Sequence, residues 1–197
     1  MAILVEHEKR RHEILERALD IFIEEGYEDA TFQKIADRCG ITRTTLYLYF
    51  KNKREIFVWS IKQLTNRVEK DLISTITNES LSYASRLESV LHVIIDLCTE
   101  NRRLFNVVLT YLLQVQKTGK DPDSRVKRRT IRLRHLLSRI LIAGKDSGEF
   151  KIDNVKAANE LFYGLIESAI FRIAILDRKD NEEIKESVTL AVRSIST

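Results

Sequence analysis

The sequence predicts an all-α fold, and three observations support that class. The 197 residues include one proline and six glycines, whereas a sheet protein of this length needs many turns. Apolar residues recur every three or four positions along most of the chain, which is the period of an amphipathic helix. No segment alternates between apolar and polar residues as a half-buried strand does.

The apolar stripes, and the breakers between them, predict three short helices followed by about six longer ones. Gly26 and Gly40 end two of the short helices. Pro122 is expected in the first turn of the helix that follows a loop at 118–122. The segment 104–115 is apolar on most sides and is expected to be a central helix. The expected helices span about 8–25, 31–38, 42–49, 52–76, from after 80 to about 98, 104–115, 122–144, 154–176 and 181–196.

The composition is typical of a soluble globular protein, with 44% hydrophobic and 31% charged residues. Cys39 and Cys98 lie far apart in the sequence and form no metal-ligand spacing, so we expect reduced thiols and a cytoplasmic location. The apolar run 2–5 is too short for a signal peptide. The segment 161–176 contains charged residues and falls short of the roughly 20 apolar residues that a membrane span needs.

Charge is distributed unevenly along the chain, although the net charge is only +4. Residues 1–30 hold nine acidic and four basic residues, whereas residues 31–54 hold six basic residues and Asp37 as their one acid. A local basic patch beside an acidic helix fits a protein that directs one surface at a polyanion.

The segment 31–47 has the spacing of a helix-turn-helix motif. Two helices that cross closely need a small residue at the crossing, and Ala36 occupies that position. The turn needs a residue that tolerates a positive φ angle, and Gly40 follows four positions later. The residues expected to form a small core with the first helix are Ile35, Ile41 and Leu46. This motif predicts a small DNA-binding domain.

The second helix of this motif is left with polar side chains on its outer face. Hydroxyl and guanidinium groups on such a face can reach base edges and phosphates in the major groove of DNA. The polar residues of this face are Thr42, Arg43, Thr44 and Thr45.

At these positions the sequence resembles the tetracycline-repressor (TetR) family. The run 45–53 is similar to the family signature T-L-Y-x-H-F-x-x-K, with Tyr49 where the family usually has histidine. Thr44 also departs from the pattern, because glycine, alanine or proline is common there. The resemblance covers about the first 60 residues. It rests on Gly26, Tyr27, Thr31, Ile35, Ala36, Gly40, Ile41, Leu46, Tyr47, Phe50 and Lys53.

The resemblance implies particular contacts with DNA. Arg43 would read a base, with guanine the expected partner; a solvated charge is the alternative. The rings of Tyr47 and Tyr49 could also pack against the first helix, and this is compatible with a DNA contact. The residues implied at base edges or thymine methyl groups are Thr44, Thr45 and Leu48. The residues implied at phosphates are Thr31, Tyr47, Tyr49 and Lys53.

Residues 1–52 are therefore expected to form the DNA-binding domain, and residues 53–197 an effector-binding and dimerisation domain. The helices of the second domain carry mostly apolar residues with a few polar ones among them, as a small-molecule pocket requires. An ordinary packed core is the alternative. The residues expected to line the pocket are Leu64, Val68, Leu91, Cys98, Phe105, Leu109, Leu137 and Phe162.

The segment 161–176 is apolar nearly all round, so it must be covered on two sides. Gly164 and Ser168 lie four residues apart and would allow another helix to approach closely. The resemblance implies that this helix and the last one form a dimer interface, which would include Val188 and Val192. Deep burial within one subunit is the alternative.

The predicted function is that of a homodimeric transcription repressor. It would bind a pseudo-palindromic operator in double-stranded DNA and release it when an apolar or aromatic small molecule binds. No cofactor, metal or catalytic residue is expected, because the sequence has no E-x-x-H, G-x-S-x-G or Walker motif. An architectural DNA-binding protein and, less favoured, a helical-bundle enzyme are the alternatives. The basic stretch 125–139 is either a solvated face or a site for an anionic effector or a second acidic contact.

Overall fold

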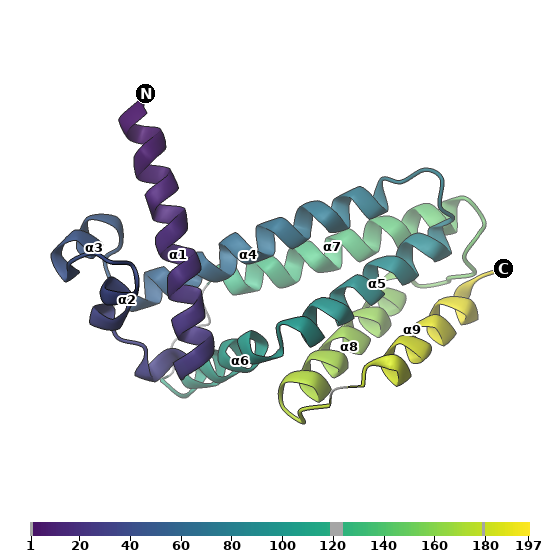
Figure 1. The fold of residues 1–197 in the computed structure, drawn as a ribbon. Coiled ribbons are helices and arrows are strands. Elements are labelled where there is room, and N and C mark those ends of the chain that lie inside the picture. Colours follow the sequence, from purple (N-terminus) through teal and green to yellow (C-terminus); the bar gives the residue numbers. More distant parts are fainter. Residues whose placement is uncertain (1, 119–123, 179) are drawn as a thin grey trace. The chain divides into compact units, whose positions relative to one another are not determined.

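The structure is a computed structural model that describes residues 2–118, 124–178 and 180–197, with side chains at 5–66, 72–118, 131–178 and 180–197. In these ranges the chain forms nine helices and no named strand (Figure 1). The expected turn at Pro122 lies outside the described residues. None of the described helices is long and apolar enough to cross a membrane. The chain divides into two compact units, 1–69 and 70–197.

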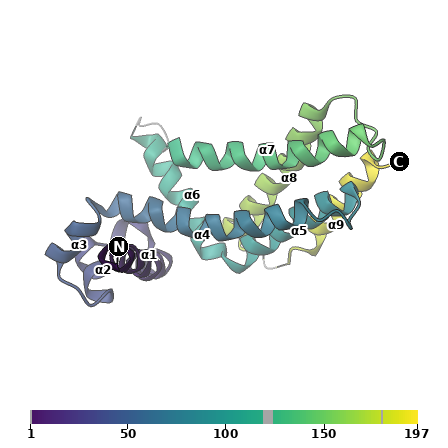
Figure 2. The same ribbon diagram turned by 90° about the horizontal axis from the view of Figure 1, so that it is seen from above.

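The first unit contains α1 (Ala2–Asp29), α2 (Phe32–Arg38), α3 (Arg43–Tyr49) and the first part of α4 (Lys53–Ile76). Figure 2 looks almost along α1, with α2 and α3 beside it. The domain boundary expected after residue 52 coincides with the start of α4. The division between the compact units falls inside that helix, because Ile56 and Phe57 of α4 are buried within the first unit.

Side-chain caps set the starts of the short helices. The Thr31 hydroxyl accepts a hydrogen bond from the Lys34 amide at 3.2 Å, and the Thr42 hydroxyl accepts one from the Thr45 amide at 3.0 Å. Each cap satisfies a backbone N–H group that has no partner within its helix. The predicted starts of α2 and α3 are therefore confirmed to within a residue.

The core of the first unit lies where α1, α2, α3 and α4 meet. Leu46 of α3 and Ile35 of α2 are fully buried, as the motif predicts, whereas Ile41 is half-buried. Gly40 adopts a φ of 66° in the turn between the two motif helices, a conformation that costs a side-chain-bearing residue free energy. The largest buried side chains of this core are Phe22, Phe50, Phe57, Ile14, Ile21, Ile35, Leu46 and Ile56.

The second unit contains the end of α4, α5 (Tyr83–Glu100), α6 (Arg102–Lys117), α7 (Ser124–Asp146), α8 (Val155–Ala174) and α9 (Glu182–Ile195). Helices α5, α8 and α9 lie side by side (Figure 1), and α7 packs against α5 and α8 (Figure 2).

Helices α5 and α8 are the central helices of this unit, and the expectation that 104–115 is central is wrong. Helix α5 contacts α6, α7, α8 and α9, whereas α6 packs mainly against α8. On α6, Leu104, Val107 and Tyr111 are buried, but Leu113 is 56% exposed. The apolar residues of α6 therefore form one buried stripe, with Leu113 left on the surface.

Tight contacts close the end of the second unit where α7 and α8 are joined. The Glu149 carboxylate accepts hydrogen bonds from the backbone amides of Tyr83 and Ala84, at 2.9 and 2.7 Å. It therefore satisfies and neutralises the N-terminal end of α5. Phe150 is buried directly against Gly144, where an added Cβ atom would lie 2.2 Å from the ring.

Candidate nucleic-acid interface

The outer face of α3 presents a cluster of exposed side chains. Leu46 is fully buried, so the opposite side of the helix faces solvent. On that side Leu48 is 75% exposed and Tyr47 is 49% exposed, and Arg43 and Thr44 are exposed beside them. The structure thus brings four of the predicted DNA-binding residues together on one short helix. A guanidinium, a hydroxyl and an apolar methyl group are suited to reading base edges in a major groove.

Arg43 and Tyr47 are linked on one flank of this face. An Nη atom of Arg43 donates a hydrogen bond to the Tyr47 hydroxyl at 3.2 Å, and the guanidinium carbon lies 5.7 Å from the ring centroid. The Tyr47 ring stacks on Phe32 of α2, with centroids 4.5 Å apart. Phe32 was not among the predicted site residues, because its contact joins two helices and leaves no mark on the sequence of α3.

Tyr49 lies half-buried on the other flank of α3, stacked on His7 near the start of α1. The ring centroids are 4.6 Å apart and the planes differ by 20°. Of the two tyrosines that could pack against the first helix, Tyr49 therefore does so through His7, and Tyr47 packs against α2. His7 was also missed by sequence reasoning; the departure of Tyr49 from the family signature was the available signal.

The three threonines at the helix starts have local partners. The hydroxyl groups of Thr42 and Thr45 lie 2.8 Å apart, and Thr42 also caps α3. Thr31 is exposed and caps α2. Contacts of these three residues with DNA stay predictions.

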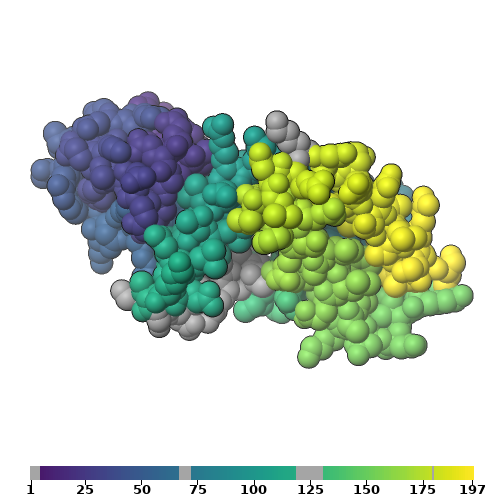
Figure 3. All heavy atoms as spheres, turned by 90° about the horizontal axis from the view of Figure 1, so that it is seen from below, coloured from purple at the N-terminus to yellow at the C-terminus, as the bar shows by residue number. Residues whose placement is uncertain are grey.

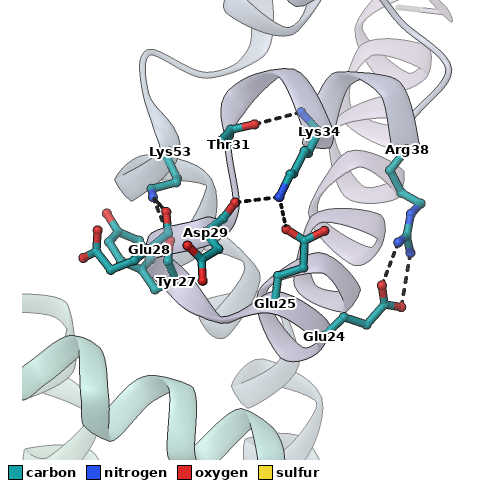
Figure 4. A network of polar contacts seen from close by, with 9 residues as sticks. All are labelled: Glu24, Glu25, Tyr27, Glu28, Asp29, Thr31, Lys34, Arg38 and Lys53. Atoms are coloured by element: carbon teal, nitrogen blue, oxygen red, sulfur yellow. Dashed lines mark hydrogen bonds and ion pairs between the residues drawn. The ribbon is translucent and has the colours of Figure 1, made fainter.

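Lys53 occupies a different environment from the one its predicted phosphate contact suggests (Figure 4). Its ammonium group donates hydrogen bonds to the carbonyl oxygens of Tyr27 at 2.7 Å and Glu28 at 2.9 Å, and it lies 4.5 Å from the centroid of the Tyr27 ring. These carbonyls lie just after Gly26, where non-helical φ and ψ angles of 85° and 169° break α1. In the protein alone Lys53 therefore holds the segment that follows the break at Gly26, and its phosphate contact stays a prediction.

Two other cations of the segment 31–54 are paired with acids of α1, as Figure 4 shows. Lys34 lies 2.6 Å from a carboxylate oxygen of Glu25, and Arg38 lies 2.7 Å from one of Glu24. The hydrogen bond from Arg38 lowers the pKa of the Glu24 carboxyl. The basic count of this segment therefore overstates the positive charge that its surface offers to DNA.

Two arginines of α1 hold the turn of the motif. Arg10 donates to the carbonyl oxygen of Cys39, and Arg17 donates to that of Arg38, both at 3.1 Å. These carbonyls lie at the end of α2, where the last C=O groups of a helix lack partners within it. These hydrogen bonds therefore hold the turn between α2 and α3 against α1.

Helix α3 is short, exposed and polar, is anchored through a buried leucine, and is joined to a second short helix by a glycine turn. These features define a helix-turn-helix DNA-binding protein. A comparison with known protein families shows which family this helix-turn-helix segment matches. The family described as bacterial regulatory proteins, tetR family, matches residues 14–58. Residues 14–58 therefore match the DNA-binding segment of that family, and the chain is a DNA-binding transcriptional regulator.

Similar proteins extend the likeness over the second unit. A fatty acid metabolism regulator protein of Bacillus subtilis is 25% identical over 172 residues, which is 85% of this chain and 84% of that protein. A TetR transcription regulator from Haloarcula marismortui superposes with a TM-score of 0.85 at 20% identity, over 96% of this chain and 100% of that chain. FadR from Bacillus subtilis, solved with stearoyl-CoA, gives a TM-score of 0.73 at 22% identity, over 91% and 95%. The two solved structures share the fold with this chain.

The residues expected to line an effector pocket fall into three groups. Leu91, Cys98, Leu137 and Phe162 are buried in the core that α5, α7 and α8 share, and burial raises the pKa of the Cys98 thiol to about 12. Phe105 and Leu109 of α6 and Leu64 of α4 are half-buried, and the side chain of Val68 lies outside the described residues. The pocket itself stays a prediction.

The predicted dimer residues divide between two environments. Gly164 and Ser168 lie on the outward side of α8, where an added Cβ atom at Gly164 would meet no atom within 4 Å. Val188 and Val192 of α9 are only 0% and 2% exposed, so they face the core of their own subunit and offer no surface to a partner. The prediction that this apolar stripe of α9 faces a partner subunit was therefore wrong for Val188 and Val192.

Other apolar side chains of α8 and α9 reach the surface instead. Figure 3 shows these two helices side by side on one face of the second unit. Because residues 161, 164, 168, 171 and 175 are three or four positions apart, they share one side of α8. The exposed apolar residues of this surface are Leu161 (49%), Phe171 (53%), Ile175 (42%), Leu176 (54%) and Leu190 (70%).

Proposed function

We propose that the chain is a homodimeric repressor that binds a pseudo-palindromic operator through α3 and releases it when an acyl-coenzyme A binds the second unit. The observation that carries the proposal is the exposed face of α3, where Arg43, Thr44, Tyr47 and Leu48 lie together over a buried anchor. Such a protein acts by binding and not by catalysis. Its DNA partner would place it in the cytoplasm.

The proposed dimer follows from the limits of one recognition helix. A helix of seven residues, as α3 is, reads only a few base pairs, so useful specificity needs two half-sites about one helical turn apart or a multiple of it. The exposed apolar side of α8, with Leu161, Phe171 and Ile175, supplies a surface that is costly to leave in water. The small side chains of Gly164 and Ser168 on the same side allow a partner helix to approach closely.

The proposed effector class is supported by the relatives and by the chemistry of this chain. An acyl-coenzyme A joins an apolar chain to an anionic, phosphate-bearing head. The shared core of α5, α7 and α8 is apolar, and the stretch 125–139 holds seven basic residues and no acid. Together they match the two ends of such a molecule. The family relative named above is a fatty acid metabolism regulator, and the solved FadR structure contains stearoyl-CoA.

Asn159 of α8 supplies a polar group at the edge of this apolar core. Its side chain is 94% buried, and its amide nitrogen donates to the Arg134 carbonyl and to the Ser138 hydroxyl. The amide oxygen has no hydrogen-bond partner among the described residues. Rotating the amide would turn that oxygen toward the Arg134 carbonyl oxygen, and two acceptors would then face each other. The amide nitrogen therefore faces Arg134. The oxygen is therefore a fitting acceptor for an amide N–H of the effector.

The proposal is tested by measuring operator affinity with and without effector. An operator is first selected from a random DNA pool, and its Kd is measured by fluorescence anisotropy. Stearoyl-CoA is expected to raise that Kd, whereas coenzyme A alone and stearate alone leave it unchanged. The ligand can change DNA affinity only by the ratio of its own affinities for the free and DNA-bound protein. If no acyl chain length changes the Kd, the effector class is wrong, while the DNA-binding function stands.

A further inference from the structure

The two tyrosines of α3 are each held by a ring from a different helix. Tyr47 and Tyr49 are two positions apart, which is a rotation of about 200° around a helix, so they lie on opposite flanks of the exposed face. Phe32 of α2 stacks on Tyr47, and His7 of α1 stacks on Tyr49, with centroid separations of 4.5 and 4.6 Å. The reading face of α3 is therefore bordered on both sides by an aromatic pair.

Such stacking matters for a tyrosine at a protein surface because it restricts the side chain before DNA arrives. A tyrosine with no neighbour on a surface helix rotates among its rotamers and loses that freedom on binding. A stacked ring has already lost it, and offset stacking adds its own attraction. His7 is itself exposed and comes from the opposite end of the motif in sequence, 42 positions before Tyr49. The contact therefore joins the first turns of α1 to the last turn of the recognition helix.

We infer that His7 is a positioning residue of the DNA interface, whose ring holds Tyr49 on the flank of α3 so that the tyrosine hydroxyl is presented to the DNA backbone. The inference rests on DNA binding through α3. A tyrosine hydroxyl at a phosphate oxygen fixes the register of the protein and carries no sequence information. His7 therefore contributes to affinity for any DNA sequence and does so through Tyr49.

The test is a double-mutant cycle on DNA binding in the full-length chain. His7→Leu, Tyr49→Leu and the double variant are compared with the unsubstituted protein on the selected operator and on random duplex DNA. His7→Leu is expected to weaken binding about two- to tenfold, by the same factor on both DNAs. In the Tyr49→Leu background, the same substitution is expected to cause no further loss, because its partner is already gone.

A rescue variant and a matched control separate positioning from folding. His7→Phe keeps an aromatic ring for Tyr49 and is expected to restore affinity to within twofold. His12→Leu removes an exposed histidine of the same helix whose ring contacts the Glu8 carbonyl, one turn away on α1. It is expected to leave DNA binding unchanged. Thermal unfolding of each variant, followed by circular dichroism, identifies any loss that comes from α1 itself.

Three results would overturn the inference while leaving the DNA-binding function intact. The first is unchanged DNA affinity in His7→Leu. The second is an equal loss from His7→Leu whether Tyr49 is present or has been replaced, which would make His7 an independent contact. The third is a His7→Phe variant as weak as His7→Leu. Failure of the unsubstituted protein to bind any selected DNA would instead contradict the function of α3.

Discussion

The ammonium group of Lys53 lies 2.7 Å from the carbonyl oxygen of Tyr27, so the first residue of α4 binds the segment that follows the break in α1 at Gly26. The residues around Tyr27 have no basic side chain among them, and Lys53 supplies two hydrogen bonds to their carbonyl groups from a distant part of the chain. Helix α4 therefore begins at a fixed point against α1. The same residue belongs to the family signature, and its contact gives a structural reason for lysine at that position.

Replacing Lys53 is expected to destabilise the first unit. Lys53→Met keeps the aliphatic stem and removes two charge-assisted hydrogen bonds, which is expected to lower the free energy of unfolding by about 1–3 kcal/mol. Urea unfolding measures the loss, and Lys51→Met, at an exposed position two residues earlier, is the control. Unchanged stability of Lys53→Met together with weaker binding to every DNA sequence would assign Lys53 to a phosphate instead.

Removing the acidic partner of Lys34 is expected to strengthen DNA binding. In Glu25→Gln the ammonium group loses its ion pair at 2.6 Å and keeps its hydrogen bond to the Asp29 carbonyl at 3.1 Å, so its charge is no longer neutralised and can attract a phosphate. Affinity for all sequences is expected to rise several-fold, and the slope of log K against log salt is expected to steepen by up to about one unit. Adding Lys34→Gln should remove the gain. Glu100→Gln, the same charge change at the end of α5, is the control; a gain as large there would show only a net-charge effect.

Two glycines provide a matched test of the dimer. Gly164→Leu adds a side chain where no atom lies within 4 Å, so the subunit is expected to stay folded while the dimer dissociates. Gly144→Leu drives a side chain into the buried Phe150 ring and is expected to lower the melting temperature instead. Light scattering and circular dichroism distinguish the two outcomes. A Gly164→Leu protein that remains dimeric with unchanged affinity would exclude this side of α8 from the interface.

The buried thiol of Cys98 predicts a loss of stability in alkali. Burial raises its pKa from 9.0 to about 12 in the folded state, so the folded protein holds this proton more tightly than the unfolded chain. The stabilisation is complete below about pH 9 and is lost as the pH rises toward 12. Between pH 8 and pH 10 the unsubstituted protein should lose about 1.4 kcal/mol more than Cys98→Ala. Parallel stability curves for the two proteins would contradict the assignment.

Local sequence signals were sufficient to predict where the helices lie and which residues cap the short ones. The hydroxyls of Thr31 and Thr42 and the glycine at position 40 act through neighbours within a few residues, so pattern and spacing locate them. The helix-turn-helix motif was predictable for the same reason, since Leu46 and Ile35 are buried where the spacing places them.

Contacts between distant segments were not predictable in this way. The stacking of His7 on Tyr49, and the hydrogen bond from Lys53 to the Tyr27 carbonyl, depend on how helices meet, and periodicity does not encode that. The same limit explains α9. Its apolar stripe correctly marks a buried face, but a stripe does not say whether the covering surface belongs to the same subunit or to a partner. Val188 packs within the subunit, and Leu190, on another side of α9, is the exposed residue.

The central claim is that α3 reads DNA sequence through its exposed face, and Arg43 tests it most directly. The Kd values of the unsubstituted protein and of Arg43→Ala are measured on the selected operator and on operators changed at each guanine of the half-site. The account predicts that one guanine change costs the unsubstituted protein about 1–3 kcal/mol and costs Arg43→Ala nothing at that position. An equal loss of affinity by Arg43→Ala on the operator, on every changed operator and on random DNA would contradict it.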